Sequence, residues 1–107
     1  MDGKRATAKI TVGESVANLS GNLHGGAIAT LVDDVGTLAI ISADKQNRPG
    51  VTTDLNVSYF APGRAGDVIL IEATALKSGR TLAYVSVDLR RESDGTLLAQ
   101  GRMTKFL

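Results

Sequence analysis

The spacing of apolar residues changes along the chain and predicts one helix among several strands. A helix is predicted at 25–42, where the apolar residues at helical spacing are Ile28, Leu31, Val32, Val35 and Ala39. Alternation or short apolar runs predict strands at 5–15, 51–60, 68–77, 81–91 and 96–107. Short turns join the last four strands. This order predicts an α+β fold, with one long helix packed on an antiparallel sheet.

The strand predicted at 51–60 alternates strictly. One face would carry Val51, Thr53, Leu55, Val57 and Tyr59. The other face would carry Thr52, Asp54, Asn56, Ser58 and Phe60. Strict alternation therefore places Thr52 and Asp54 side by side on the polar face.

The predicted helix has a second face beside its apolar stripe. The residues on it are Ala29, Asp33, Gly36 and Ile40. Small residues allow another backbone to approach closely, so we expect this face to meet a second subunit, with Asp33 at the seam. The alternative is that Asp33 and Asp34 are simply exposed to solvent.

Length and composition narrow the class of protein. A chain of 107 residues fits a single domain, 1–107. There is no cysteine and only one histidine, which excludes disulfides, thiolate catalysis and a multi-histidine metal site within one chain. A net charge of +1 does not show the excess of basic residues that is typical of nucleic-acid-binding proteins. We expect no membrane span, because Asp33 and Asp34 interrupt the best apolar run.

The start of the predicted helix offers chemistry for a developing negative charge. Gly25 opens the helix, and a glycine lets a ligand approach the unpaired N–H groups of a helix N-terminus. Asn18 or Asn22 could add a side-chain N–H, and His24 could act as a general base. Alternatively, the glycine and asparagines only form a turn, and the histidine binds local backbone. Thr52 could equally reflect β-propensity alone.

Four segments carry a family resemblance: "NLSGNLHGGAIATLVDDVGTLAI", "GVTTDLNVSYFAPGRAGD", "LKSGRTLAYVSVDLR" and "GTLLAQGRMTKFL". Together they resemble the hotdog-fold acyl-CoA thioesterases, most of all the branch of thioesterase superfamily member 2 (acyl-CoA thioesterase 13) and the phenylacetate-pathway thioesterases. The resemblance implies a long helix wrapped by a curved antiparallel sheet. It also implies hydrolysis of acyl-CoA to free acid and CoA in fatty acid metabolism, by homodimers paired into tetramers with no cofactor beyond the substrate's CoA.

The resemblance also assigns site residues. Asp33 matches the catalytic acid, and Thr52 falls where the family orients the attacking water. The Gly25 N–H and the Asn18 amide would polarise the thioester carbonyl from the partner subunit. The implied substrate and CoA contacts are His24, Asp54, Tyr59, Phe60, Ala61, Pro62, Gly63, Arg64, Lys77, Ser78, Gly79, Arg80, Thr81, Leu82 and Lys105. The cationic ones among them, Arg64, Lys77, Arg80 and Lys105, could bind the CoA phosphates.

Two departures from the family pattern leave alternatives open. The family's N-terminal helix and first strand have no counterpart here, so the sheet is expected to lack an edge strand or the chain to be a short form. Met103 stands where close relatives often have histidine. The alternatives to a thioesterase are a hotdog dehydratase or hydratase acting on acyl thioesters, and a non-enzymatic acyl-CoA binding module. A cytoplasmic location is expected, with the mitochondrion as the alternative.

Overall fold

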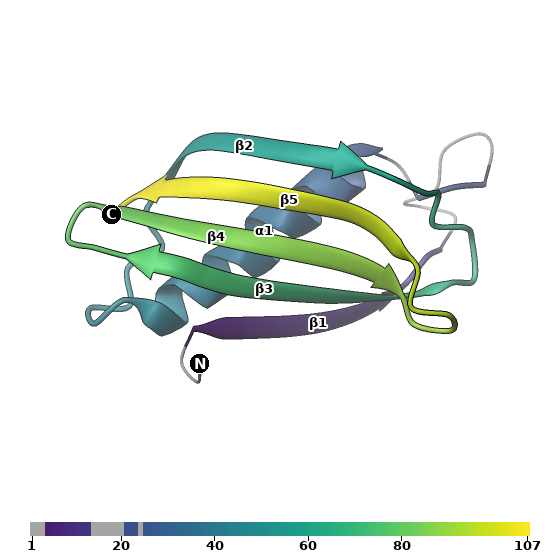
Figure 1. The fold of residues 1–107 in the computed structure, drawn as a ribbon, viewed down its shortest axis with the longest axis horizontal. Helices are drawn as coiled ribbons and strands as arrows, with labels where there is room; N and C mark the ends of the chain where they lie inside the picture. The colour runs from purple at the N-terminus through teal and green to yellow at the C-terminus, as the bar shows by residue number, and fades with distance from the viewer. Residues whose placement is uncertain (1–3, 14–20, 24) are drawn as a thin grey trace.

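A single helix lies against a five-stranded sheet in the computed structural model, which describes residues 4–13, 21–23 and 25–107 (Figure 1). The elements are β1 (Arg5–Thr11), α1 (Gly25–Ala43), β2 (Val51–Tyr59), β3 (Val68–Ser78), β4 (Leu82–Arg91) and β5 (Leu97–Phe106). Each element predicted from the hydrophobic pattern is present, within a few residues at its ends. The predicted α+β class, with one helix on an antiparallel sheet, is confirmed.

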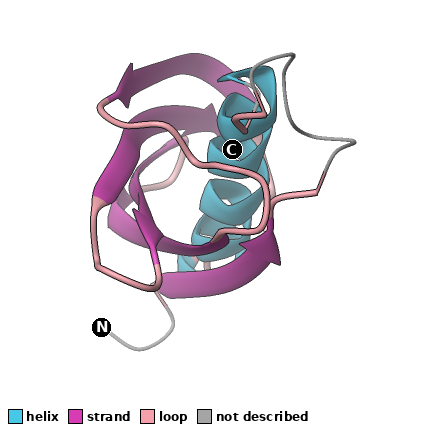
Figure 2. Ribbon diagram, turned by 90° about the vertical axis from the view of Figure 1, so that its right-hand side faces the viewer, coloured by secondary structure: helices cyan, strands magenta, loops and turns pink. Residues whose placement is uncertain are grey.

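The sheet places β1 and β2 at its two edges. The strand order is β1-β3-β4-β5-β2, and every neighbouring pair is antiparallel. The chain therefore passes from one edge to the other through α1, and β3 then returns beside β1. Figure 2 shows that the sheet curves around the helix. This wrapped helix is the architecture that the hotdog resemblance implies.

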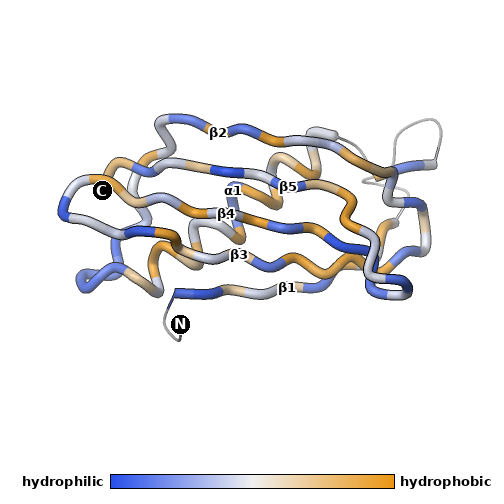
Figure 3. Tube along the Cα trace, viewed as in Figure 1, coloured by the Kyte–Doolittle hydropathy of each residue, from blue (hydrophilic) through white to orange (hydrophobic). Residues whose placement is uncertain are grey.

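The core lies between the helix and the concave face of the sheet. Alternate residues of the central strands β3 and β4 are buried. Along β4 the colour of the tube changes repeatedly between hydrophobic and hydrophilic (Figure 3). The inward side chains include Ile69, Ile71, Val87 and Leu89, all without solvent exposure. From the helix, Val32, Ala39 and Ile40 are equally buried. Apolar burial on this scale is the main stabilising contribution to a domain of this size.

The second face of α1 packs differently from the expectation. Gly36 and Ile40 were expected at a subunit seam, yet both are buried against the protein's own sheet. A Cβ atom added at Gly36 would lie 2.8 Å from Met103 Cε and 3.2 Å from Val85 Cγ1. The prediction was wrong at these positions because the curved sheet covers more of the helix circumference than a flat one would. Asp33, on the same face, is only partly buried.

Helix α1 also meets the length and composition criteria of a membrane span, with 19 residues and a mean hydropathy of 1.5. Asp33 and Asp34 do not lower its hydropathy enough to prevent this, contrary to the expectation from the sequence. One such helix is weak evidence, because the core helix of a globular domain has the same properties. The stripe that α1 packs on the sheet assigns it to the core of the domain.

An ion pair between Asp44 and Arg48 follows the C-terminal end of α1. Asp44 is buried and accepts hydrogen bonds from the Arg48 backbone N–H (2.8 Å) and from Arg48 Nε and Nη2 (3.0 and 2.9 Å). These bonds lower the pKa of Asp44 from 3.8 to about 2, with the side chain of Arg48 as the largest cause. Asn47, with a φ of 55°, donates its amide to the carbonyl of Ile41 near the helix end.

Asp44→Asn should therefore destabilise the fold in a pH-dependent way. The pKa of Asp44 is lower in the folded state than in the unfolded state, so its contribution is present above about pH 4 and is lost as the pH falls toward about 2. We expect the variant to melt several degrees below wild type at neutral pH and the two melting curves to converge on acidification. Thermal unfolding between about pH 7 and pH 2 tests this, with Asp34→Asn, at an exposed position of the same helix, as control. A difference in Tm that stays constant with pH would contradict it.

Candidate active site

Three polar side chains from three elements meet on the helix side of the sheet. Thr52 of β2 donates its hydroxyl to Asp33 Oδ1 of α1 at 3.1 Å. Lys105 of β5 donates its ammonium to Thr52 Oγ1 at 3.2 Å. Asp33 and Thr52 are partly buried, and Lys105 is only 6% exposed. The structure thus brings together Asp33 and Thr52, as the resemblance implied, and adds Lys105 to them.

A β-bulge decides which way Thr52 points. In the β2–β5 pair, Thr52 lies opposite Lys105 and Asp54 lies opposite Thr104, so Thr53 is an extra residue in β2. Lys105 and Thr104 are consecutive and point to opposite faces of the sheet. Thr52 therefore points toward the helix and Asp54 away from it. The predicted strict alternation was wrong here, because the bulge shifts the phase between these two residues.

Asp54 lies in a depression on the outer, convex face of the sheet. This cavity of about 550 Å³ is also lined by Lys77, Tyr84, Arg102 and Thr104. Asp54 was predicted as a substrate contact beside Thr52. The structure separates the two residues by the thickness of the sheet.

The start of α1 meets the segment after β2. Gly25 lines a pocket of about 340 Å³ together with Tyr59, Phe60, Ala61, Pro62 and Gly63, all of them predicted site residues, and with Asn22, Leu23 and Ile28. The Tyr59 hydroxyl donates to the Gly25 carbonyl oxygen at 3.0 Å. The backbone N–H of Gly25 takes no part in this hydrogen bond. Two further predicted residues, Asn18 and His24, lie outside the residues that the structure describes.

The loop that carries Arg64 is fixed by Asp67. The backbone N–H of Arg64 donates to Asp67 Oδ2 at 2.9 Å, and Arg91 Nε donates to the same atom at 3.1 Å. These two donors, the backbone one foremost, hold the pKa of Asp67 below its usual value. Arg91 Nη2 also donates to the Pro62 carbonyl oxygen at 2.9 Å. The Arg64 side chain itself remains exposed.

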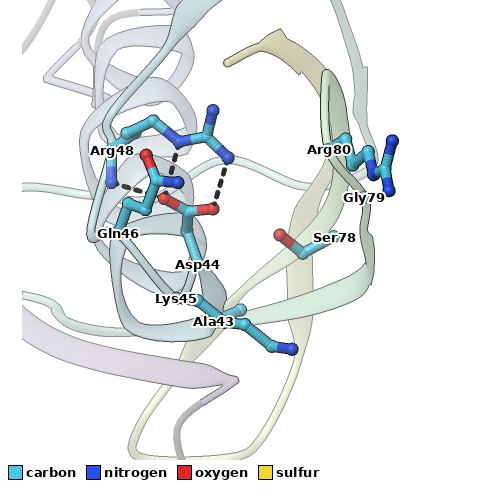
Figure 4. Close-up of a pocket in the computed structure, with 8 residues that line it drawn as sticks. All are labelled: Ala43, Asp44, Lys45, Gln46, Arg48, Ser78, Gly79 and Arg80. Atoms are coloured by element: carbon cyan, nitrogen blue, oxygen red, sulfur yellow. Dashed lines mark hydrogen bonds and ion pairs between the residues drawn. The ribbon is translucent and has the colours of Figure 1, made fainter.

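Another pocket, of about 430 Å³, lies at the C-terminal end of α1 (Figure 4). Its lining includes Ser78, Gly79 and Arg80, which were predicted to contact CoA, and also Lys45 and Arg48. Figure 4 shows the Asp44–Arg48 pair on the helix side, facing the turn between β3 and β4. Lys77, Thr81 and Leu82 continue this turn and are exposed.

The pocket at the start of α1 and the pocket at its end are too far apart to form one site in a single chain. Gly25 begins the 19-residue helix and Ala43 ends it, and at a rise of about 1.5 Å per residue their separation is about 27 Å. Gly25 and Asp33 are likewise about 12 Å apart along the axis. One carbonyl group cannot contact both, so the predicted residues would act together only across two subunits.

Sequence reasoning missed the place of Lys105. It was predicted among the cationic contacts to CoA, yet its ammonium binds Thr52 inside the cluster. A signal was present in β5, where Gly101, Met103 and Lys105 alternate in phase and all three are buried. Among the described residues, no group of three Asp, Glu or His side chains is placed to hold a metal ion.

A family model of the thioesterase superfamily matches residues 20–98. The chain belongs to the thioesterase superfamily. The matched region contains the helix, the bulge and the Asp33–Thr52 contact, but not Lys105. Among relatives of this superfamily, human acyl-coenzyme A thioesterase 13 is 44% identical over 96% of this chain and 73% of its own length.

Solved structures of similar proteins agree with the fold. Zebrafish thioesterase superfamily member 2 has a TM-score of 0.94 at 44% identity, over 97% of this chain and 75% of the other. A Streptococcus mutans protein crystallised with acetyl-CoA has a TM-score of 0.89 at 28% identity, over 96% of this chain and 80% of the other. The resemblance inferred from the four sequence segments is confirmed, and so is the hotdog architecture.

Proposed function

We propose that this protein hydrolyses the thioester of acyl-CoA to a free acid and CoA, with Asp33 activating the attacking water. The observation that carries the proposal is the 3.1 Å contact between Asp33 and Thr52 in a member of the thioesterase superfamily. The name of the human relative and the acetyl-CoA in the S. mutans structure support acyl-CoA as the substrate class.

Asp33 and Thr52 together can hold one water molecule by both of its hydrogens. Thr52 gives its single hydrogen to Asp33 Oδ1 and accepts one from Lys105, which leaves one lone pair on its oxygen. That lone pair and Asp33 Oδ2 can each accept a hydrogen from water. The water oxygen then attacks the carbonyl carbon while its proton passes to Asp33, and breaking of the C–S bond releases CoA, whose sulfur takes that proton. A positioned base of this kind contributes roughly 10²–10⁴-fold.

The negative charge on the carbonyl oxygen needs hydrogen-bond donors from a second subunit. We assign this role to the Gly25 N–H and the Asn18 amide of a partner, since Gly25 is about 12 Å along the helix from Asp33 of its own chain. One such donor is worth roughly 10²–10³-fold in rate. A homodimer, paired into a tetramer, is part of this proposal. CoA itself is part of the substrate, and no further cofactor is proposed.

The edge strand β2 supports such an assembly. Its exposed side chains include Val51 (69%), Leu55 (39%) and Tyr59 (54%). The opposite edge, β1, instead exposes the charged Arg5 and Lys9, which discourage edge pairing. Apolar side chains along an unpaired strand favour association with another copy. The cationic residues Arg64, Lys77 and Arg80 would then meet the CoA phosphates.

Release of free thiol from a panel of acyl-CoAs tests the proposal. Wild-type turnover on one or more of them is expected, and aliphatic acyl chains are favoured by family analogy. Turnover of enoyl-CoA or hydroxyacyl-CoA without thiol release would instead support a dehydratase or hydratase. Binding of acyl-CoA with no conversion would support a binding module. Either result would overturn the proposed hydrolysis.

Replacing Thr52 separates the hydroxyl from the shape of the side chain. Thr52→Val removes the donor to Asp33 and the acceptor for water, while Thr52→Ser keeps both. A hydrogen bond to a charged group is worth about 1.5–3 kcal/mol, so we expect kcat to fall about 10- to 100-fold in the valine variant. The serine variant should retain most of the activity. Steady-state kinetics measure both, and equal rates in the two variants would remove Thr52 from the mechanism.

A further inference from the structure

Lys105 is a buried lysine on the helix side of the sheet. It is 6% exposed, whereas Arg64, Lys77 and Arg80 are exposed. Taking an ammonium group out of water costs free energy unless its donors are satisfied. Within the described part of the chain, Lys105 makes no ion pair, and its hydrogen bond goes to Thr52 Oγ1. Its position therefore differs from that of a surface residue that meets a phosphate.

The strand register explains why Thr52 is the partner. Lys105 lies opposite Thr52 of β2 on one side and opposite Ala83 of β4 on the other. Ala83 is fully buried and has no polar side-chain atom. The strands β2 and β5 lie side by side in Figure 1. Across the sheet, Thr52 is thus the one adjacent side chain that can accept a hydrogen from Lys105.

This hydrogen bond fixes the direction of the Thr52 hydroxyl. An ammonium group has donors only, so Thr52 must be the acceptor in its contact with Lys105. The hydroxyl hydrogen is then free to point at Asp33 Oδ1 (3.1 Å) or at Met103 Sδ (3.6 Å). A carboxylate is the much stronger acceptor. The order of donation is therefore Lys105 to Thr52 to Asp33.

We propose that Lys105 is a positioning residue that orients the Thr52 hydroxyl toward Asp33 and so sets the geometry of the attacking water. This inference rests on the proposed function. It replaces the role in phosphate binding that the sequence alone assigned to Lys105. The two roles make different demands on the substrate, because positioning requires only the thioester, whereas phosphate binding requires the nucleotide part of CoA.

The test compares two substrates with the same acyl group, an acyl-CoA and the acyl-pantetheine that lacks the adenosine and its phosphates. Lys105→Met keeps the length and apolar stem of the side chain and removes the donor. We expect kcat to fall about tenfold on both substrates, with KM little changed. The matched control is Lys9→Met, which removes one positive charge from the exposed edge strand and should leave both rates unchanged.

A double-mutant cycle adds a readout that a structural role would not produce. Because Lys105 acts through Thr52, the variant T52V/K105M should be no slower than T52V alone. Losses that multiply, a KM effect confined to acyl-CoA, or wild-type kinetics in Lys105→Met would each overturn the proposal. Where the methionine variant gives no cooperative unfolding, Lys105→Leu takes its place in the same comparison, since leucine also has an apolar side chain and no donor for Thr52. If wild type cleaves neither thioester, the proposed function fails first.

Discussion

Replacing Asp33 by asparagine should nearly abolish thioester hydrolysis while leaving the fold intact. The asparagine side chain has the same shape, and its carbonyl oxygen can still accept the hydroxyl hydrogen of Thr52 at the position of Oδ1. It cannot take a proton from water. We expect kcat to fall by about 10²–10⁴-fold, with KM and Tm close to those of wild type. Free-thiol release and thermal unfolding measure the two effects.

Asp34 provides the matched control. It is the next residue of the same helix, carries the same charge and is exposed. Asp34→Asn should therefore change neither the rate nor the Tm, because surface substitutions away from special contacts have small effects. Equal losses in the two variants would mean that the negative charge of the helix matters rather than the carboxylate at Thr52. An active Asp33→Asn variant would exclude Asp33 as the base.

The second large effect is expected on stability, at Gly101. This residue lies in the middle of β5 and faces Val32 of the helix. A Cβ atom added there would lie 2.6 Å from Val32 Cγ1 and 2.9 Å from Val32 Cγ2. Val32 is fully buried and branched at Cβ, which leaves it one favoured rotamer in a helix. Gly101→Ala should therefore cost about 1–3 kcal/mol.

Denaturant and thermal unfolding measure this loss of stability. Two further variants serve as a control and as a test of its cause. Gly13→Ala is the control, because an added Cβ there has no atom of the described residues within 4 Å. In the double variant V32A/G101A the clashing methyl groups are gone, so its loss of stability should be smaller than the sum of the losses in the two single variants. A Gly101→Ala variant as stable as wild type would show that the helix can move away from β5 without cost.

The hydrophobic pattern predicted the elements because each has a single clear period. The stripe from Ile28 to Ala39 is helical, and the central strands alternate or are uniformly apolar. Their pairing order was not predictable from periodicity, since the choice of neighbours depends on contacts between residues far apart in the chain. The curvature of the sheet is also collective, and it explains why Gly36 and Ile40 were misassigned to a subunit seam.

The candidate site was only partly predictable. Asp33, Thr52 and Gly25 were named from motif and resemblance, and the structure brings the first two into contact. The bulge at Thr53 has no glycine to signal it, so simple alternation placed Thr52 on the wrong face. The position of Lys105 followed from the register of β2 against β5, which a pattern within one strand does not contain.

The donor chain from Lys105 to Asp33 is among the most non-local features of this molecule. The Lys105–Thr52 contact joins residues 53 positions apart, whereas the β3–β4 and β4–β5 turns close over short loops. Loop-closure entropy opposes long-range pairings until their contacts compensate for it. A partly folded chain can hold the β3–β4–β5 meander and still have no acid–hydroxyl pair. Catalytic activity in this fold therefore requires the complete sheet. Turnover measures the pairing of β2 with β5 as well as the chemistry of the site.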